Sequence, residues 1–292
     1  MAIKDIHNYG RSVKARLLNV AHNEGLQYQL LLTRYFQERL LYRLSVSSYR
    51  NSFLLKGGAL LYAHERFAAR PTLDIDFMGQ FIDNDKQNIK QAMSEICSIP
   101  YMEDGVIFII DTIRTEDIAL EKRYPGIRLT LTATLDSVRQ DVSMDIGFGD
   151  IVTPSPVELD YPNLLEGFSM TSILAYSIET VIAEKFQTLI DRAEANSRMK
   201  DFYDLYTLLK SNKYDCDILR EAVKATFNNR NTAYQQNHPF FSAEFVSNTN
   251  LTIRWNAFIK KLQPTNSLTF SEVVKFLQEK LSDYWKDYGR NI

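Results

Sequence analysis

The sequence has little of what a disulfide-stapled or zinc-binding protein needs. Only two of its 292 residues are cysteines, Cys97 and Cys216, and they lie far apart in the chain. A disulfide framework or a cysteine-based zinc cluster requires more cysteines at closer spacing, so both are excluded. The four histidines also show no ligand spacing. This usage of cysteine suits a reducing compartment, and we expect a cytoplasmic protein.

Long apolar runs are missing as well. No run approaches the roughly 18 apolar residues of a membrane-spanning helix, and the first residues, Met1 to Asp5, lack the apolar core of a signal peptide. We therefore expect no membrane partner. A net charge of −2 at pH 7 argues against a broad basic surface but leaves room for a local basic groove. With 45% hydrophobic and 24% charged residues, the composition is that of a globular protein.

The most informative stretch is a glycine turn followed by two closely spaced acids. Lys56-Gly57-Gly58 precedes a short helical pattern, and Thr72-Leu73-Asp74-Ile75-Asp76-Phe77 follows it. Side chains alternate between the faces of a strand, so Asp74 and Asp76 share one face with Thr72. Two carboxylates ~4 Å apart repel by about 4 kcal/mol at an effective dielectric of about 20. A divalent cation would compensate this repulsion.

An Asp-x-Asp pattern alone is common on solvated edges and turns, but here three features favour a metal site. The acids lie inside a strand pattern. The glycine pair precedes a helix, and backbone N–H groups at such a turn can hold phosphate oxygens. A third strand-borne acid, Asp145, lies on the polar face of a later strand pattern. If the two strands are neighbours, the three carboxylates converge on one sheet face.

The rest of the chain divides by its periodicity into an α+β core and a helical remainder. We expect helices over 3–50, with the interleaved arginines on solvated faces or, alternatively, forming a wall for a polyanion. Further predicted elements are strands at 52–55, 72–80, 105–111, 127–135 and 142–148, an amphipathic helix at 85–98, and an irregular loop at 149–168. The predicted domains are an N-terminal helical segment (1–50), a core (51–160) and a helical C-terminal domain (165–292).

Two further groups carry charges at helical spacing. Ser177 is a plausible N-cap of a helix that extends to about Arg192, and Lys185 lies at the edge of its apolar stripe. This lysine either extends to the surface or is held against an anion. Asp201 and Asp204, three residues apart, lie on the same side of the next helix. They are either solvated acids or part of the functional site.

These motifs, taken in order, resemble those of the AbiEii/AbiGii-type toxins, which are nucleotidyltransferases of the DNA polymerase beta superfamily. Lys56 to Leu60 with Arg70 to Phe77 resembles the first motif, and Met144 to Asp150 the second. Ala183 to Phe186 resembles the third motif, and Arg198 to Leu205 the fourth. Arg-Pro-Thr stands where Arg-x-Ser is common, which keeps the hydroxyl. The match spans about residues 50–210.

The resemblance implies a mixed sheet flanked by helices, a helical C-terminal half, and transfer of a nucleoside monophosphate from an NTP to an acceptor. It also implies Mg²⁺ or Mn²⁺ as the cofactor and tRNA or another RNA as the acceptor. The chain would be the toxin of a toxin–antitoxin or phage-defence pair, and its protein partner would be the antitoxin. The implied metal ligands are Asp74, Asp76 and Asp145. The implied nucleotide-binding residues are Lys56, Gly57, Gly58, Arg70, Thr72 and Lys185. The resemblance also implies a catalytic role for Lys185, together with Asp201 or Asp204.

Two other functions remain open at this point. The chain could be a binding module that keeps the fold but only grips a nucleotide, RNA or a partner. It could also be an antibiotic-type nucleotidyltransferase with a small acceptor. The three intact acids disfavour the first alternative, and the region from Lys185 to Asp204 disfavours the second.

Overall fold

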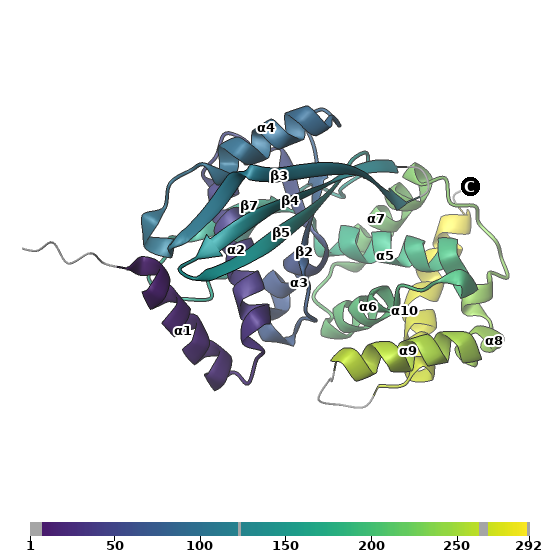
Figure 1. The fold of residues 1–292 in the computed structure, drawn as a ribbon. Coiled ribbons are helices and arrows are strands. Elements are labelled where there is room, and N and C mark those ends of the chain that lie inside the picture. The colour runs from purple at the N-terminus through teal and green to yellow at the C-terminus, as the bar shows by residue number, and fades with distance from the viewer. Residues whose placement is uncertain (1–7, 122–123, 263–267, 291–292) are drawn as a thin grey trace, which may run out of the picture. The chain divides into compact units, whose positions relative to one another are not determined.

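The computed structural model describes residues 8–121, 124–262 and 268–290, and the chain divides into two units (Figure 1). The first unit consists of residues up to 149 together with 157–175. The second consists of residues 150–156 and those from 176 onward. Part of the predicted helical segment, residues 3–7, lies outside the described residues.

The first unit begins with two helices, and side-chain caps mark the start of two of its helices. In α1 (Tyr9–Asn23), the Asn8 side chain accepts a hydrogen bond from the backbone N–H of Arg11 at 3.0 Å. In α4 (Lys86–Cys97), Asp85 caps the first turn in the same way. The remaining helical elements are α2 (Tyr28–Ser45), α3 (Gly57–Glu65) and the short 3₁₀ turns η1 (Arg66–Ala68) and η2 (Met102–Asp104).

A mixed sheet forms the body of this unit. In the described part of the chain it has seven strands in the order β3-β4-β5-β2-β1-β7-β6. Their bounds are β1 (Phe53–Lys56), β2 (Asp74–Gly79), β3 (Val106–Glu121), β4 (Tyr124–Leu135), β5 (Val138–Gly147), β6 (Val157–Tyr161) and β7 (Thr171–Ala175). The pairs β2–β5 and β1–β7 are parallel, and the others are antiparallel. The predicted mixed sheet flanked by helices is confirmed.

One face of the sheet is apolar and forms the core. Ile75 pairs with Met144, which pairs in turn with Leu129 on β4, and all three side chains are fully buried. Helix α2 packs on β5 and β7, and α4 packs on β3 and on α2. Because side chains alternate along a strand, Asp74, Asp76 and Asp145 face the opposite side of the sheet. The alternation in the sequence therefore predicted the two faces correctly.

The prediction of an irregular loop over 149–168 is wrong in part. Strand β6 lies within this range, and β7 follows it shortly afterwards. The β6–β7 hairpin joins the edge of the sheet, because β7 pairs with β1 through Leu55 and Ala175. Both strands have only five residues, and most side chains of β6 are exposed. Local hydrophobic periodicity is therefore too weak to indicate them.

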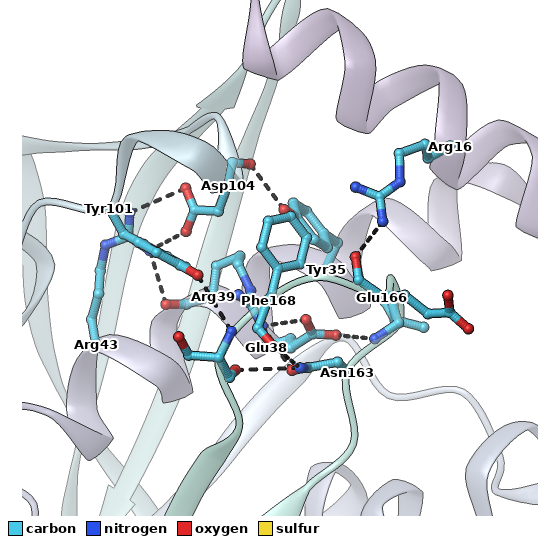
Figure 2. A network of polar contacts seen from close by, with 12 residues as sticks. Arg16, Tyr35, Glu38, Arg39, Arg43, Tyr101, Asp104, Asn163, Glu166 and Phe168 are labelled. Atoms are coloured by element: carbon cyan, nitrogen blue, oxygen red, sulfur yellow. Dashed lines mark hydrogen bonds and ion pairs between the residues drawn. The ribbon is translucent and has the colours of Figure 1, made fainter.

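The arginines of α2 are buried, so the expected solvated positions are wrong for Arg34, Arg39 and Arg43. Arg39 and Arg43 belong to a network of polar contacts inside the first unit (Figure 2). Arg39 pairs with Glu38 and donates to Asn163 at 3.1 Å. Arg43 donates to both oxygens of Asp104, at 2.7 and 3.4 Å. These contacts hold α2 to the segments before β3 and after β6.

The second unit is helical. The helices are α5 (Ile178–Arg192), α6 (Met199–Ser211), α7 (Cys216–Asn229), α8 (Ala243–Val246), α9 (Thr249–Leu262) and α10 (Phe270–Arg290), with short turns η3 (Ala193–Ala195) and η4 (Pro239–Phe241). Ser177 caps α5 by accepting from the backbone N–H of Thr180, as predicted. Aromatic side chains fill the core, among them Phe186, Phe202 and Trp255. Over the described ranges of the chain, no helix is both long and apolar enough to cross a bilayer.

Candidate active site

A row of charged residues runs across four neighbouring strands of the first unit. Asp76 on β2 pairs in register with Asp145 on β5, which confirms that these strands are neighbours. On the other side of Asp76 lies Lys56 of β1, and on the other side of Asp145 lies Arg128 of β4. Residues paired across strands project to the same face. The row therefore reads lysine, aspartate, aspartate, arginine, with Asp74 two residues before Asp76.

The glycine turn packs directly against the acid pair. Gly57 has φ +67°, and a Cβ built on it would lie 1.9 Å from Oδ2 of Asp76. A Cβ on Gly58 would lie 2.7 Å from Cβ of Thr72. No larger residue fits either position without moving these neighbours. The structure thus places the predicted glycine turn against the predicted strand of acids, at a distance that leaves no room for a Cβ at Gly57 or Gly58.

The backbone around this turn suits an anion. Helix α3 begins at Gly57, and its N-cap residue, Lys56, makes no side-chain capping hydrogen bond. The first N–H groups of such a helix need outside partners, and a phosphate is a suitable one. Thr72 donates through Oγ1 to the carbonyl of Asp74 at 3.2 Å, which orders the entry of β2. Arg70 is half-buried and donates to the carbonyl of Pro71 at 3.3 Å.

Arg128 is a residue that the sequence analysis did not assign to the site. Its Nε donates to Oδ1 of Asp145 and its Nη2 to Oδ2, both at 2.7 Å. The Asp145 side chain is 10% exposed and that of Arg128 38%. These hydrogen bonds, followed by the nearby charges of Asp145, Asp74 and Glu116, raise the pKa of Arg128, against the opposing effect of burial. The guanidinium is therefore bonded to Asp145 and lies in the field of two further acids.

A signal for Arg128 was present in the sequence. Strands β4 and β5 are joined by the two residues Asp136 and Ser137, so that Leu135 pairs with Val138. A two-residue hairpin fixes the register of both strands. Counting back from that turn places Arg128 opposite Asp145.

The donor set fits a divalent cation in its chemistry. Carboxylate oxygens are the ligands that Mg²⁺ and Mn²⁺ prefer, and three carboxylates lie on one face of two adjacent strands. However, both oxygens of Asp145 bond to Arg128. Among the residues that the structure describes, no three acidic, histidine or cysteine side chains stand ready as a ligand cluster.

The second unit holds the predicted lysine and acids. Nζ of Lys185 on α5 lies 2.7 Å from Asp201 and 2.8 Å from Asp204, both on α6. The two acids are almost completely buried, and Arg198 pairs with Asp201 at 2.7 Å. Burial alone would favour the neutral carboxyl, but Lys185 and Arg198 lower the pKa of Asp201 to about 2. Both acids thus hold the lysine, and neither is a solvated surface acid.

A second ion cluster lies nearby in this unit. Arg230 pairs with Asp150 at 2.9 Å and with Glu184 at 3.4 Å, and it donates to Gln187 at 3.0 Å. Asp150 ends the stretch Met144–Asp150, and Glu184 directly precedes Lys185. The sequence analysis did not identify Arg230, because its partners lie far from it in the sequence. The cluster ties segment 150–156 to α5.

A mixed sheet with a glycine turn and strand-borne acids on one open face, joined to a helical unit, is the arrangement of a nucleotidyltransferase. The family model for the AbiEii nucleotidyl transferase toxin of type IV toxin–antitoxin systems matches residues 39–278. The chain therefore belongs to the AbiEii family of nucleotidyltransferase toxins. No curated protein matches the sequence.

Two solved structures from Helicobacter pylori share the fold. One is described as a candidate nucleotidyltransferase: it is 18% identical, with a TM-score of 0.51, and the match covers 91% of this chain and 99% of that one. The other, JHP933, is 17% identical, with a TM-score of 0.50, and the match covers 91% of this chain and 96% of that one. At these identities the likeness concerns the fold alone.

Proposed function

We propose that this nucleotidyltransferase toxin moves a nucleoside monophosphate from an NTP to an RNA hydroxyl, with tRNA as the first acceptor to test. The observation that carries the proposal is the row of Lys56, Asp76, Asp145 and Arg128 beside the glycine turn. It combines acids that suit metal ions with cations and backbone donors that suit phosphate. A cognate antitoxin is the expected protein partner, as in the type IV systems of the family.

Each group has a role that follows from its place. The N–H groups of Gly57 and Gly58 bind triphosphate oxygens, and Lys56, Arg70 and Thr72 surround them. Asp74, Asp76 and Asp145 would hold Mg²⁺ or Mn²⁺, which supplies charge stabilisation of the attacking and leaving oxygens when bound. For the second unit, we propose that Lys185 offsets phosphate charge while Asp201 and Asp204 hold its ammonium group in place.

The proposed reaction is a displacement at the α-phosphorus. A new bond forms between the acceptor hydroxyl oxygen and phosphorus, and the bond to the β-phosphate oxygen breaks. Pyrophosphate leaves with that electron pair. The hydroxyl proton passes to a carboxylate, and Asp145 is the proposed acceptor because it lies beside Asp76 in the row.

The test offers the purified full chain each α-labelled NTP in turn, with Mg²⁺ and total bacterial tRNA. Label on tRNA that disappears in Asp76→Asn is the expected result, with the melting temperature of the variant nearly unchanged. Release of pyrophosphate without labelled RNA would show that the acceptor is not RNA but another class of molecule. A fully active Asp76→Asn variant would contradict the proposed site.

A further inference from the structure

The Arg128–Asp145 pair is a bidentate ion pair within the charged row. A guanidinium presents two parallel N–H donors, and here both are aligned with the two oxygens of one carboxylate at 2.7 Å. Asp145 is 8% exposed, so few other partners can reach it. Each of its oxygens accepts a hydrogen bond from Arg128.

A metal ion and a guanidinium compete for a carboxylate. The two N–H groups occupy one lone pair on each oxygen. They also place a positive charge beside the carboxylate, which repels an approaching cation. Asp76 is the register neighbour of Asp145, so a cation bound to both acids would lie next to the guanidinium. Two further acids, Asp74 and Glu116, lie near Arg128. They offer its guanidinium alternative partners when it releases Asp145.

We propose that Arg128 is a positioning residue that withholds Asp145 from the metal in the nucleotide-free enzyme. The inference rests on the proposed function, because it takes Asp74, Asp76 and Asp145 as the metal ligands. The complete metal site then forms only when Arg128 releases Asp145. The nucleotide-free toxin therefore binds divalent cations more weakly than it would if Asp145 were not paired with Arg128.

The structure offers a matched control for this competition. Arg114 on β3 pairs with Asp141 on β5 at 3.3 Å. Asp141 lies four residues before Asp145 on the same strand. The side chain of Arg114 is 72% exposed. Arg114→Gln removes the same charge from the same sheet without touching Asp145. It therefore separates a specific effect at Asp145 from a general change in the field of the protein.

The experiment is a Mn²⁺ titration of the nucleotide-free full chain, followed by the electron paramagnetic resonance signal of free Mn²⁺. Arg128→Gln is expected to bind Mn²⁺ about tenfold more tightly than the wild type, since it removes one competing, partly screened charge. Arg114→Gln is expected to change the affinity by less than about twofold. Damage to the fold would weaken binding and so cannot mimic the expected gain. Far-ultraviolet circular dichroism verifies that each variant is folded.

The outcomes separate this inference from the proposed function. Mn²⁺ binding that depends on Asp76 but is unchanged in Arg128→Gln would overturn the inference and leave the proposed function standing. An equal gain in Arg114→Gln would also overturn it, because the effect would be one of net charge. Failure of every variant to bind Mn²⁺, with or without NTP, would overturn the metal site itself and the inference with it.

Discussion

At the scale of single residues, the site depends on contacts that leave almost no freedom in residue type. Gly57 combines a left-handed backbone with a position that leaves no room for a Cβ beside the carboxylate of Asp76. Asp145 uses both oxygens on Arg128. The types of these residues could be recognised in the sequence, as could the sheet face that the acids occupy. The partner of Asp145 could be found by counting back from the two-residue turn between β4 and β5. The contact between Gly57 and Asp76 could not, because a helix and a loop separate them in the sequence.

The glycine contact gives the first prediction. Gly57→Ala should destabilise the protein by about 1 kcal/mol through backbone strain and should also displace Asp76, which lowers nucleotidyl transfer at least tenfold. Gly25→Ala is the matched control, because Gly25 has φ +64° and nothing within 4 Å of a new Cβ. Denaturant unfolding and label transfer are measured for both. Equal activity in the two variants would argue against the steric role of Gly57.

Asp201 gives a prediction about pH. Although burial disfavours its charge, Lys185 and Arg198 lower its pKa to about 2 in the folded protein. A group whose pKa is lowered on folding stabilises the native state above its unfolded pKa of about 4, and the contribution disappears as the pH falls toward 2. The free energy of unfolding should therefore decrease by about 2 kcal/mol from this group between pH 4 and pH 2.

The measurement compares the wild type with Asp201→Asn by urea unfolding at several pH values in this window. The variant loses the titrating carboxyl, so its unfolding free energy should fall less steeply below pH 4. Parallel curves for the two proteins would show that Asp201 is not held ionised by its neighbours.

At the scale of elements, alternation and capping were sufficient for most of the chain. Strand β2, the two-faced pattern of β4 and β5, and the start of α5 at Ser177 all follow from local sequence. The β6–β7 hairpin could not be predicted, because it joins the sheet through the pairing of β7 with β1, which is distant in sequence. The burial of the α2 arginines was missed for a similar reason. Arg43, for example, bonds to Asp104 and to the carbonyl of Ile99, which belong to other segments.

This buried network gives a prediction for α2. Asp104 is fully buried and bonds to Arg43 (Figure 2). Asp104→Asn should lower the free energy of unfolding by about 3 kcal/mol, because it leaves a buried guanidinium without its counter-charge. Asp136→Asn, which breaks the exposed pair with Lys14, should have a much smaller effect. Similar losses in the two variants on chemical denaturation would contradict this account of how α2 is held.

At the scale of the whole molecule, the chain combines a sheet unit that carries the acids with a helical unit that carries Lys185 and its two partners. Family membership as a nucleotidyltransferase toxin accounts for both sets of motifs. The order of the motifs along the chain was enough to predict the fold and the class of enzyme. The acceptor and the preferred base depend on surface shape and side-chain detail that neither motifs nor periodicity encode.

The central claim is that the charged row on β1, β2, β5 and β4 performs the transfer, and one pair of variants tests it most directly. Asp145 and Asp141 lie on the same strand and the same face, and each pairs with an arginine of the same sheet, Asp145 with Arg128 of the adjacent β4 and Asp141 with Arg114 of β3. Label transfer from NTP is measured for Asp145→Asn and Asp141→Asn side by side. The account predicts that Asp145→Asn loses transfer while Asp141→Asn keeps most of it. Equal activity in both variants would contradict it.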